Sequence, residues 1–331
     1  MPGAVGQLAR CGTWAVAAAA ALVLAVLAGC GGEQEAGERG GGDLSIATGG
    51  TGGVYAVYGG GLADAISRNL EGYRATAETT SASVDNIKLI ARKDSDIAFT
   101  LADTAIDAVE GRESFDEPQP IRALGEIYTN YTQVATVAGK DISSIEHLRG
   151  KRVSVGDPGS GTEVIALRVL EAAGLDPDED IDRNQLGVDE SVNALRDGSI
   201  DAFFWSGGLP TGAVTDLATT EELRLLPTAE YAKALRDEYG EAYRADTIPK
   251  DTYKGLPADV RTVAVPNLLV VHEEMDEGLA HDLTGLLFAQ KERLVAVHPE
   301  AENLDPQRAQ DVVAPVQLHP GAERYYQEAA R

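Results

Sequence analysis

The chain repeats one structural pattern twice, and this repeat constrains its fold more than any other feature. Each copy begins with a short apolar strand, at 44–48 and at 151–155, and continues through a glycine-rich loop, at 49–53 and at 156–161. A helix is expected after each loop, because apolar residues recur there at helical spacing. Strands that alternate with helices are typical of parallel sheets covered by helices, so the pattern predicts an α/β fold.

Both copies end in a strand that opens with the same residue types, Asp-Ile-Ala-Phe from Asp96 and Asp-Ala-Phe from Asp201. Two similar α/β lobes are therefore expected. The run of three glycines at 59–61 weakens a helix but lets another backbone come close. The further predicted elements are helices at 54–69, 84–93, 162–173 and 190–196, and strands at 74–79, 96–100 and 200–205.

The two glycine-rich loops are the candidate ligand site. Ligands of parallel α/β sheets bind beyond the carboxyl ends of the strands, where these loops lie. Each loop precedes a helix, and the free N–H groups and dipole at a helix N-terminus favour an anion. Thr51, Ser160 and Thr162 would add hydroxyl donors. Two facing lobes of this kind suit a small solute with two acidic ends.

The same loops allow other interpretations. The first is close to a dinucleotide fingerprint, but Tyr55 stands where the third glycine belongs. The second is like a phosphate loop, yet it lacks the lysine, and Glu163 would repel phosphate. Ser160 lies outside the G-x-S-x-G pattern of hydrolases. The glycines can also serve tight turns alone. No cofactor is predicted.

Catalytic and metal-binding patterns are scarce. The five histidines form neither H-x-x-x-H nor H-E-x-x-H. The two cysteines are Cys11 and Cys30, and both lie before the predicted folded part, which leaves that part without a thiol. An enzyme is therefore not expected, although a triad assembled from distant residues stays an alternative. The net charge of -25 also argues against a nucleic-acid partner.

The N-terminus predicts export and a lipid anchor. Residues 1–29 contain a short apolar run that ends in Leu-Ala-Gly before Cys30, which resembles a bacterial lipobox. We expect 1–29 to be a signal peptide, Cys30 to carry lipid, and the polar, glycine-rich 30–43 to be a flexible tether. The chain would then work outside the cytoplasm, anchored to the cell membrane. A plain cleaved signal or a short anchor helix are the alternatives.

Motifs in both lobes resemble the TAXI family of TRAP-transporter solute receptors. They are Ile46-Ala-Thr-Gly-Gly-Thr-Gly-Gly-Val-Tyr55, Ser83-Val-Asp-Asn-Ile87, the segment 148–162 around Gly-Asp-Pro-Gly-Ser-Gly-Thr, and Asp201-Ala-Phe-Phe-Trp205. Val54, Trp205 and Pro266-Asn267 depart from the family's pattern, and these departures concern the shape of the pocket rather than the class of protein.

The resemblance implies a type II periplasmic-binding-protein fold, with two mixed sheets flanked by helices and a ligand cleft between two lobes. Lobe 1 would comprise 44–134 and 263–331, and lobe 2 would comprise 135–262. The chain would cross between the lobes near 132–138 and near 262–271, where Pro266 fits an edge or a bend. Helices at 276–298 and around 321–330 would pack on lobe 1.

The resemblance also implies a function. The chain would capture a small acidic solute, such as glutamate, 2-oxoglutarate or a similar dicarboxylate or amino acid, and deliver it to a TRAP-type membrane permease. A binding lipoprotein of an ATP-driven importer and an exported hydrolase stay open as alternatives. Phe203 is expected in the core, and Trp205 either in the core or at the cleft. The implied ligand contacts are Thr51, Gly52, Gly53, Val54, Tyr55, Ser81, Ser83, Ser160, Gly161, Thr162 and Trp205.

Overall fold

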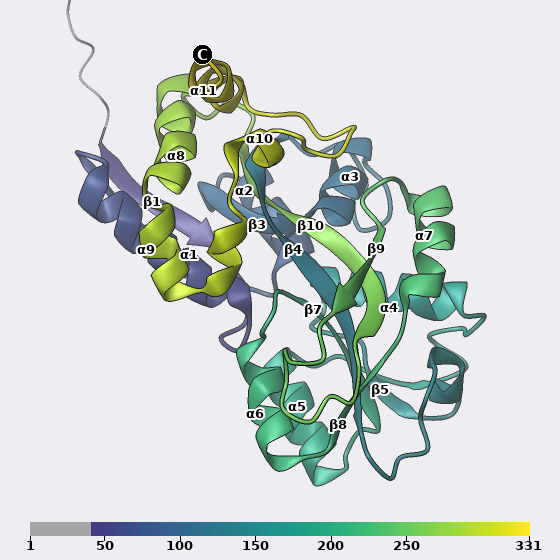
Figure 1. Ribbon diagram of the computed structural model, residues 1–331. Helices are drawn as coiled ribbons and strands as arrows, with labels where there is room; N and C mark the ends of the chain where they lie inside the picture. Colours follow the sequence, from purple (N-terminus) through teal and green to yellow (C-terminus); the bar gives the residue numbers. More distant parts are fainter. Residues whose placement is uncertain (1–40) are drawn as a thin grey trace, which may run out of the picture. The chain divides into compact units, whose positions relative to one another are not determined.

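Two long antiparallel strands, β4 (Ile121–Val137) and β10 (Val260–His272), run side by side through the middle of the fold (Figure 1). The computed structural model describes residues 41–331, so the predicted signal peptide, Cys30 and nearly all of the tether lie outside the described residues. On either side of β4 and β10 the sheet continues into an α/β lobe. The predicted crossings at 132–138 and 262–271 thus fall on the two long strands.

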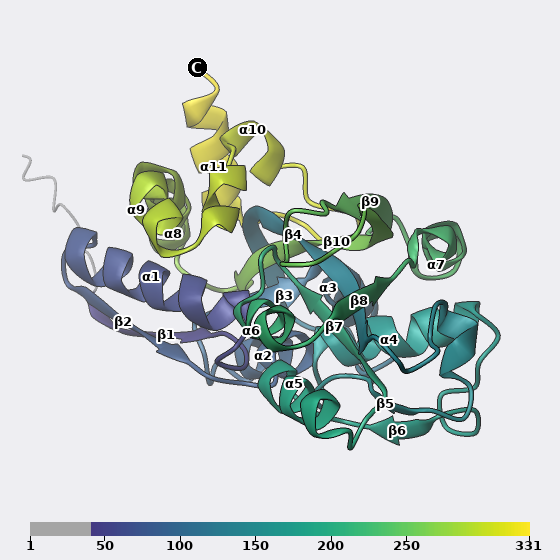
Figure 2. The same ribbon diagram turned by 60° about the horizontal axis from the view of Figure 1, so that its bottom comes forward.

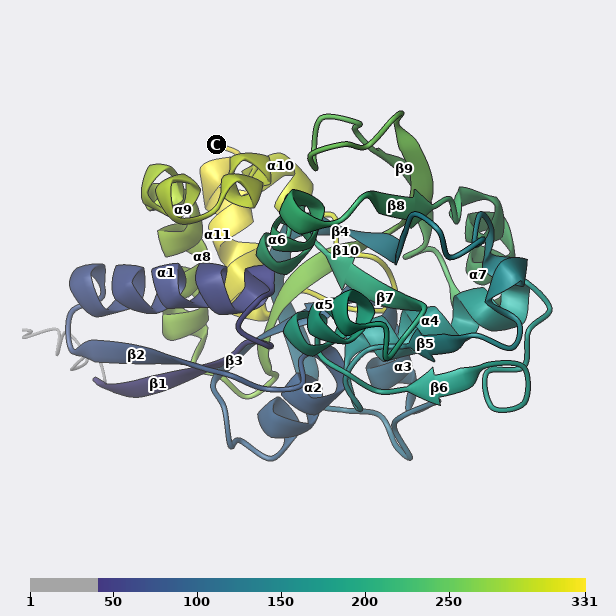
Figure 3. The same ribbon diagram turned by 90° about the horizontal axis from the view of Figure 1, so that it is seen from below.

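Lobe 1 has three further strands and helices on both of their faces. The parallel strands lie in the order β2-β1-β3, and β3 pairs antiparallel with β10. In Figure 3, α1 lies on one face of these strands and α2 on the other. The elements are β1 (Gly42–Ala47), α1 (Val54–Asn69), β2 (Tyr73–Glu78), α2 (Ser83–Ala91), β3 (Ile97–Leu101) and α3 (Ala102–Glu110). The predicted helix at 54–69 is confirmed to the residue.

The C-terminal segment returns to lobe 1, as predicted. Its helices pack beside α1 and on β4 (Figure 2). The helix expected at 276–298 is broken at Gln290, where α8 ends and α9 begins. The elements are α8 (Glu277–Ala289), α9 (Lys291–Val297), the 3₁₀ helix η3 (Pro299–Asn303), α10 (Pro306–Ala309) and α11 (Pro320–Ala329).

Lobe 2 is built in the same way. Parallel strands lie in the order β7-β5-β6, while β7 and β8 pair antiparallel with β4 and β9 pairs antiparallel with β10. A short 3₁₀ helix, η1 (Ile145–Leu148), leads into the lobe, and another, η2 (Ala229–Tyr231), precedes α7. The other elements are β5 (Arg152–Ser154), α4 (Gly161–Ala172), β6 (Asp182–Asn184), α5 (Val188–Asp197), β7 (Ala202–Gly207), α6 (Gly212–Thr220), β8 (Leu223–Leu226), α7 (Ala232–Tyr239) and β9 (Arg244–Ile248).

The strands of both lobes belong to one hydrogen-bonded sheet, although two sheets were expected. Because β10 pairs with β3 of lobe 1, β4 pairs with β7 of lobe 2, and β4 and β10 pair with each other, the order β2-β1-β3-β10-β4-β7-β5-β6 is continuous. The predicted lobe boundaries, at 134/135 and 262/263, lie inside these two strands. An apolar core also crosses between the lobes, and it joins Ile87 of α2 to Val169 of α4.

Pro266 lies in a central strand rather than at an edge. Along one edge of β10, the residues up to Ala264 pair with β9 and the residues from Asn267 onward pair with β3. The proline therefore occupies the gap between two strand partners, where its missing N–H leaves no ladder bond unmade. A register shift follows at Asn267/Leu268, which agrees with the predicted bend.

The glycine run in α1 allows close packing of side chains rather than of a second backbone. A Cβ on Gly59 would lie 2.4 Å from Cγ2 of Thr48, and a Cβ on Gly61 would lie 3.1 Å from Val297. Gly60 faces open space. The helix can therefore approach the end of β1 closely, which fixes the start of the glycine-rich loop. No helix within residues 41–331 has both the length and the apolar character to cross a membrane.

Candidate functional site

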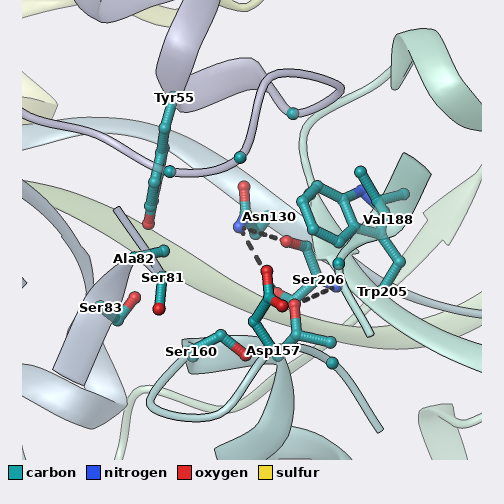
Figure 4. A pocket seen from close by; sticks show the side chains of 18 of the residues that line it. Tyr55, Ser81, Ala82, Ser83, Asn130, Asp157, Ser160, Val188, Trp205 and Ser206 are labelled. Atoms are coloured by element: carbon teal, nitrogen blue, oxygen red, sulfur yellow. Dashed lines mark hydrogen bonds between the residues drawn. The ribbon is translucent and has the colours of Figure 1, made fainter. Parts of the chain in front are cut away.

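A small cavity lies between the two lobes, at the carboxyl ends of their parallel strands. Its volume is about 40 Å³, which is room for a few water molecules. The walls come from the loops after β1, β2, β5 and β6, and from residues of the strands β3, β4 and β7. Figure 4 shows Tyr55, Ser81 and Ser83 on one side of this space, and Asp157 and Ser160 on the other.

Nearly all predicted ligand contacts come together at this cavity, although they are far apart in the sequence. Thr51 and Gly52 are the exceptions, because they line an adjoining groove at the rim. The predicted residues that line the cavity are Gly53, Val54, Tyr55, Ser81, Ser83, Ser160, Gly161, Thr162 and Trp205. Whether they contact a solute stays a prediction.

Thr51 and Gly52 contact the opposite lobe. The Thr51 hydroxyl donates a hydrogen bond to the Asp189 carboxylate at 3.0 Å. A Cβ on Gly52 would lie 2.2 Å from the same carboxylate, so a larger residue there would displace the Asp189 side chain. Asp189 stands in the first turn of α5 in lobe 2. These two residues therefore hold the lobes together at the rim.

The N-termini of α1, α2, α4 and α5 all open on the cavity. Ser160 is the N-cap of α4, and its hydroxyl accepts the N–H of Glu163 at 3.0 Å. The first N–H groups of a helix have no partner within the helix. Val54 and Tyr55 of α1 and Gly161 of α4 thus bring backbone donors to the cavity wall. Such a convergence of helix N-termini favours an anion, and anion binding stays a prediction.

Three predicted hydroxyls hold the site together by accepting backbone N–H groups. Ser160 caps α4, Ser83 accepts from Leu101 at 3.1 Å, and Thr162 accepts from Ser206 at 3.1 Å. An accepting hydroxyl still has its own hydrogen to donate. Each of these side chains can therefore fix its loop and also donate to a bound oxygen.

A chain of side-chain hydrogen bonds links the two lobes through the long strands. Tyr55 donates to Asn267 on β10, and Asn267 donates to Asn130 on β4 at 2.8 Å. Asn130 donates to the carbonyl of Ser206 on β7 at 3.0 Å (Figure 4). Ser206 in turn donates its N–H to Thr162 of α4. Because Asn130 and Asn267 are buried, this chain fixes both sides of the cavity relative to each other.

The lobes are closed on each other. The carbonyl of Gly159 in lobe 2 accepts the N–H groups of Val84 and Asp85 at the start of α2, at 3.1 and 3.3 Å. A Cβ on Gly161 would lie 2.5 Å from Leu101 of lobe 1. Gly53 of lobe 1 likewise lies close to the Trp205 ring. Glycine at these positions permits the close approach of the two lobes.

The predictions for the aromatic residues Phe203 and Trp205 have different outcomes. Phe203 is fully buried in the core of lobe 2, as predicted. Trp205 lines the cavity, and its ring nitrogen donates to the Thr211 hydroxyl at 2.9 Å. That hydroxyl donates onward to the carbonyl of Gly208 at 2.8 Å, so the loop after β7 fixes the ring.

Sequence reasoning missed several residues of the cavity wall. Asn130 and Ser206 lie within strands, where a single polar residue carries little signal. Asp157 follows Gly156, whose φ of +103° turns the chain back so tightly that a Cβ there would meet Thr162. The start of α5, at Val188, could have been found, because Gly187 precedes an amphipathic helix.

Asn86 shows how a motif residue can serve structure alone. Its side-chain amide donates to the carbonyls of Thr48 at 2.7 Å and Phe99 at 2.8 Å. Its oxygen accepts from the Thr80 hydroxyl at 2.6 Å. The residue is fully buried and joins the ends of β1 and β3, from which two walls of the cavity start.

Burial dominates the titration of the aromatic wall. It raises the pKa of Tyr55 and of Tyr128 far above the ordinary value, so both phenols are neutral donors at any physiological pH. Among residues 41–331, no three His, Cys, Asp or Glu side chains are grouped so that they could hold a metal ion.

The sequence profile of the NMT1-like family matches residues 46–329. Among solved structures, the periplasmic aliphatic sulphonate binding protein SsuA from Escherichia coli is similar, with 12% identity, coverage of 86% of this chain and 82% of that chain, and a TM-score of 0.45. A putative L-cystine ABC transporter protein from Listeria monocytogenes has 14% identity, coverage of 77% and 93%, and a TM-score of 0.47. An ancestral arginine-binding protein bound to arginine has 16% identity, coverage of 78% and 97%, and a TM-score of 0.47.

Proposed function

The chain belongs to the NMT1-like family, and we propose that it is the extracytoplasmic solute-binding receptor of a TRAP-type, ion-gradient-driven importer. The observation that carries the receptor role is the cavity between two lobes, lined by four helix N-termini. Its place at the carboxyl ends of parallel strands is where α/β folds bind ligands. The choice of a TRAP permease rests on the sequence resemblance alone.

Binding would work by lobe closure. Loops of both lobes form the walls of the cavity, so a bound solute would contact both lobes. The solute would dock on one lobe, and contacts from the other would stabilise the closed state. Only contacts made preferentially in the closed state can shift this equilibrium. Thr51, Asp189 and Gly159 supply such contacts between the lobes.

The solute would carry at least one carboxylate or a similar anionic group. The N–H groups at the starts of α1 and α4 and the hydroxyls of Ser83, Ser160 and Thr162 are the donors for it. Glutamate, 2-oxoglutarate and similar acids are the expected class. A lipid on Cys30 would keep the receptor close to its permease.

The first test is ligand-induced stabilisation of the full chain in detergent. Melting temperature would be measured with glutamate, glutamine, 2-oxoglutarate and C4-dicarboxylates. A ligand at a hundred times its Kd stabilises the native state by about 2.7 kcal/mol. A melting temperature that no member of the panel raises would remove this solute class.

A paired variant tests the residues. We expect Thr51→Val with Ser160→Ala to weaken calorimetric affinity about tenfold or more, since each hydrogen bond contributes about 1 kcal/mol. Loss of the Ser160 cap would also lower stability by about 1 kcal/mol. The control is Thr76→Val with Ser114→Ala, because both of these side chains are exposed. Equal affinity in all three proteins would mean that the loops only shape the fold.

The rival is the binding lipoprotein of an ATP-driven importer, which could use the same cavity. Vesicles reconstituted with the permease encoded beside this chain would distinguish the two. Uptake driven by a sodium gradient without ATP supports the proposal, and uptake that requires ATP contradicts it.

A further inference from the structure

One carboxylate of the cavity wall has no partner. Asp157 lies in the loop before α4, and Figure 4 shows its side chain turned into the cavity near Asn130 and Ser206. Among residues 41–331, no side chain or backbone N–H donates to its carboxylate. One of its oxygens lies 2.9 Å from where a Cβ of Gly187 would be, so the wall is tight on that side.

The surroundings of Asp157 disfavour the ionised form of its carboxyl group. Burial raises its pKa, and the negative charges of Glu190 and Glu163 raise it further. Those two acids have partners of their own. Glu163 pairs with Arg183 at 2.7 Å, and Glu190 accepts the N–H of Gly187 at 3.3 Å. Asp157 is therefore the acid near the cavity that still needs a positive charge.

No such charge lines the cavity. The described residues of its wall are glycines, apolar residues, hydroxyl-bearing and aromatic residues, one asparagine and Asp157, and none of them is Lys, Arg or His. A solute with two carboxylates would therefore find helix N-termini for one end and no cation for the other. Its second charge would also face Asp157.

The two polar features of the wall are close together. Asp157 and the α4 N-cap Ser160 belong to one turn, in which the N–H of Ser160 donates to the carbonyl of Asp157 at 3.0 Å. A group bound to the start of α4 and a group bound to Asp157 must then be neighbours on the solute. The remaining wall, formed by Leu101, Val188 and Trp205, suits an uncharged remainder.

We propose that Asp157 is a specificity-determining residue that receives an ammonium group of the solute. The proposal rests on the solute-receptor function and replaces the acidic solute class expected above by amino acids without net charge. The bound solute carries an amine next to its carboxylate and no second acidic group, so it is a zwitterion without net charge. Dicarboxylates that lack an amine are selected against by repulsion from Asp157.

Matched solutes test this on the native full chain in detergent by calorimetry. L-Leucine and 4-methyl-2-oxopentanoate differ at the amine alone, and L-glutamine and L-glutamate differ in the side-chain charge. We expect the amine-bearing member of the first pair and the uncharged member of the second to bind at least tenfold more tightly. A pair in which the two members bind equally, or in the reverse order, overturns the proposal.

The variant Asp157→Asn assigns the effect to its residue. It should reduce the preference for leucine over its 2-oxo acid to less than threefold, mainly by weakening the binding of leucine. Asp182→Asn is the matched control, because it removes one negative charge from an exposed position of the same lobe, and it should keep the native preference. An unchanged preference in Asp157→Asn contradicts the proposal.

The results distinguish a failure of the Asp157 proposal from a failure of the receptor function. Binding of these solutes without the expected preferences removes the role of Asp157 and leaves the receptor function standing. If the full chain binds neither these four solutes nor the acids of the first panel, the receptor function itself fails. The binding of the matched solute pairs to the native chain tests the proposal even if Asp157→Asn does not fold.

Discussion

At the scale of single residues, Glu300 is a carboxylate whose pKa is strongly raised by its surroundings. It lies in η3 of the C-terminal segment and is only 5% exposed. It accepts the N–H of Leu209, in the loop after β7, and the side-chain amide of Asn303 at 2.7 Å. Burial raises its pKa to about 7, although these two donors counteract the rise. The residue joins the C-terminal part of lobe 1 to the loop that follows β7, the strand of Trp205.

The raised pKa of Glu300 predicts a pH-dependent stability. Between pH 4.5 and about 7 the folded protein keeps a proton that the unfolded chain has released. Stability from this group is therefore present at low pH and is lost as the pH rises to about 7. We expect Glu300→Gln to remove this loss, which is on the order of 3 kcal/mol. Urea unfolding at pH 5, 6, 7 and 8 measures it.

Glu302→Gln is the control, because Glu302 is exposed in the same 3₁₀ helix. Its unfolding free energy should follow the native pH curve. If the curves of Glu300→Gln and the native protein run parallel from pH 5 to 8, Glu300 does not titrate in this range.

At the scale of elements, a buried polar network joins α3 of lobe 1 to α4 of lobe 2. The Arg168 guanidinium of α4 contacts Asp107 of α3 at 2.6 Å and Asp103 at 3.9 Å. The Tyr243 hydroxyl accepts from Arg168 at 2.8 Å and donates to Asp103 at 2.7 Å. All four side chains are buried. The two lobes are thus tied together by buried polar side chains.

Arg168→Met should leave the buried Asp103 without its cation and Asp107 with only the partly exposed Arg112. Breaking a buried ion pair from one side costs about 3–5 kcal/mol. We expect the free energy of unfolding in urea to fall by that amount, and Asp107→Asn in the same chain to restore part of it. Arg92→Met is the control, because its partner Asp94 is also exposed. A surface pair of this kind contributes less than about 1 kcal/mol. Equal losses in the two arginine variants would contradict the prediction.

At the scale of the whole molecule, one sheet and one cavity depend on both lobes at once. β4 and β10 carry the sheet across, and Asn130 and Asn267 on them connect the two walls by hydrogen bonds. Closure brings Trp205 of lobe 2 against Gly53 of lobe 1. The environment of this indole therefore reports whether the lobes are open or closed.

We expect a binding solute to shift the tryptophan emission of the full chain to shorter wavelength, since closure removes water from the Trp205 ring. The chain has two tryptophans, Trp14 and Trp205. Trp14→Phe should keep the shift and Trp205→Phe should lose it. A solute that binds by calorimetry but leaves the emission of Trp14→Phe unchanged would show that binding does not close the lobes around Trp205.

Much of the fold could be predicted from local sequence. The helix at 54–69 and the strands around it follow from apolar spacing and from the glycines that end each strand. The glycine-rich loops identified most of the cavity wall, because a loop between a parallel strand and a helix has only one place to lie. Whether the lobes share a sheet depends on the length of β4 and β10, and no local pattern gives that length.

The sequence by itself determined the two α/β units, their glycine-rich turns and the anion-favouring helix N-termini, because these depend on neighbours along the chain. Only the tertiary structure decided that Thr51 meets Asp189, that Asn130 meets Asn267, and that Asp157 faces the cavity without a partner. Such contacts depend on lobe closure and on the paths of two central strands. They join residues far apart in the chain, so the spacing of residue types along the sequence does not predict them.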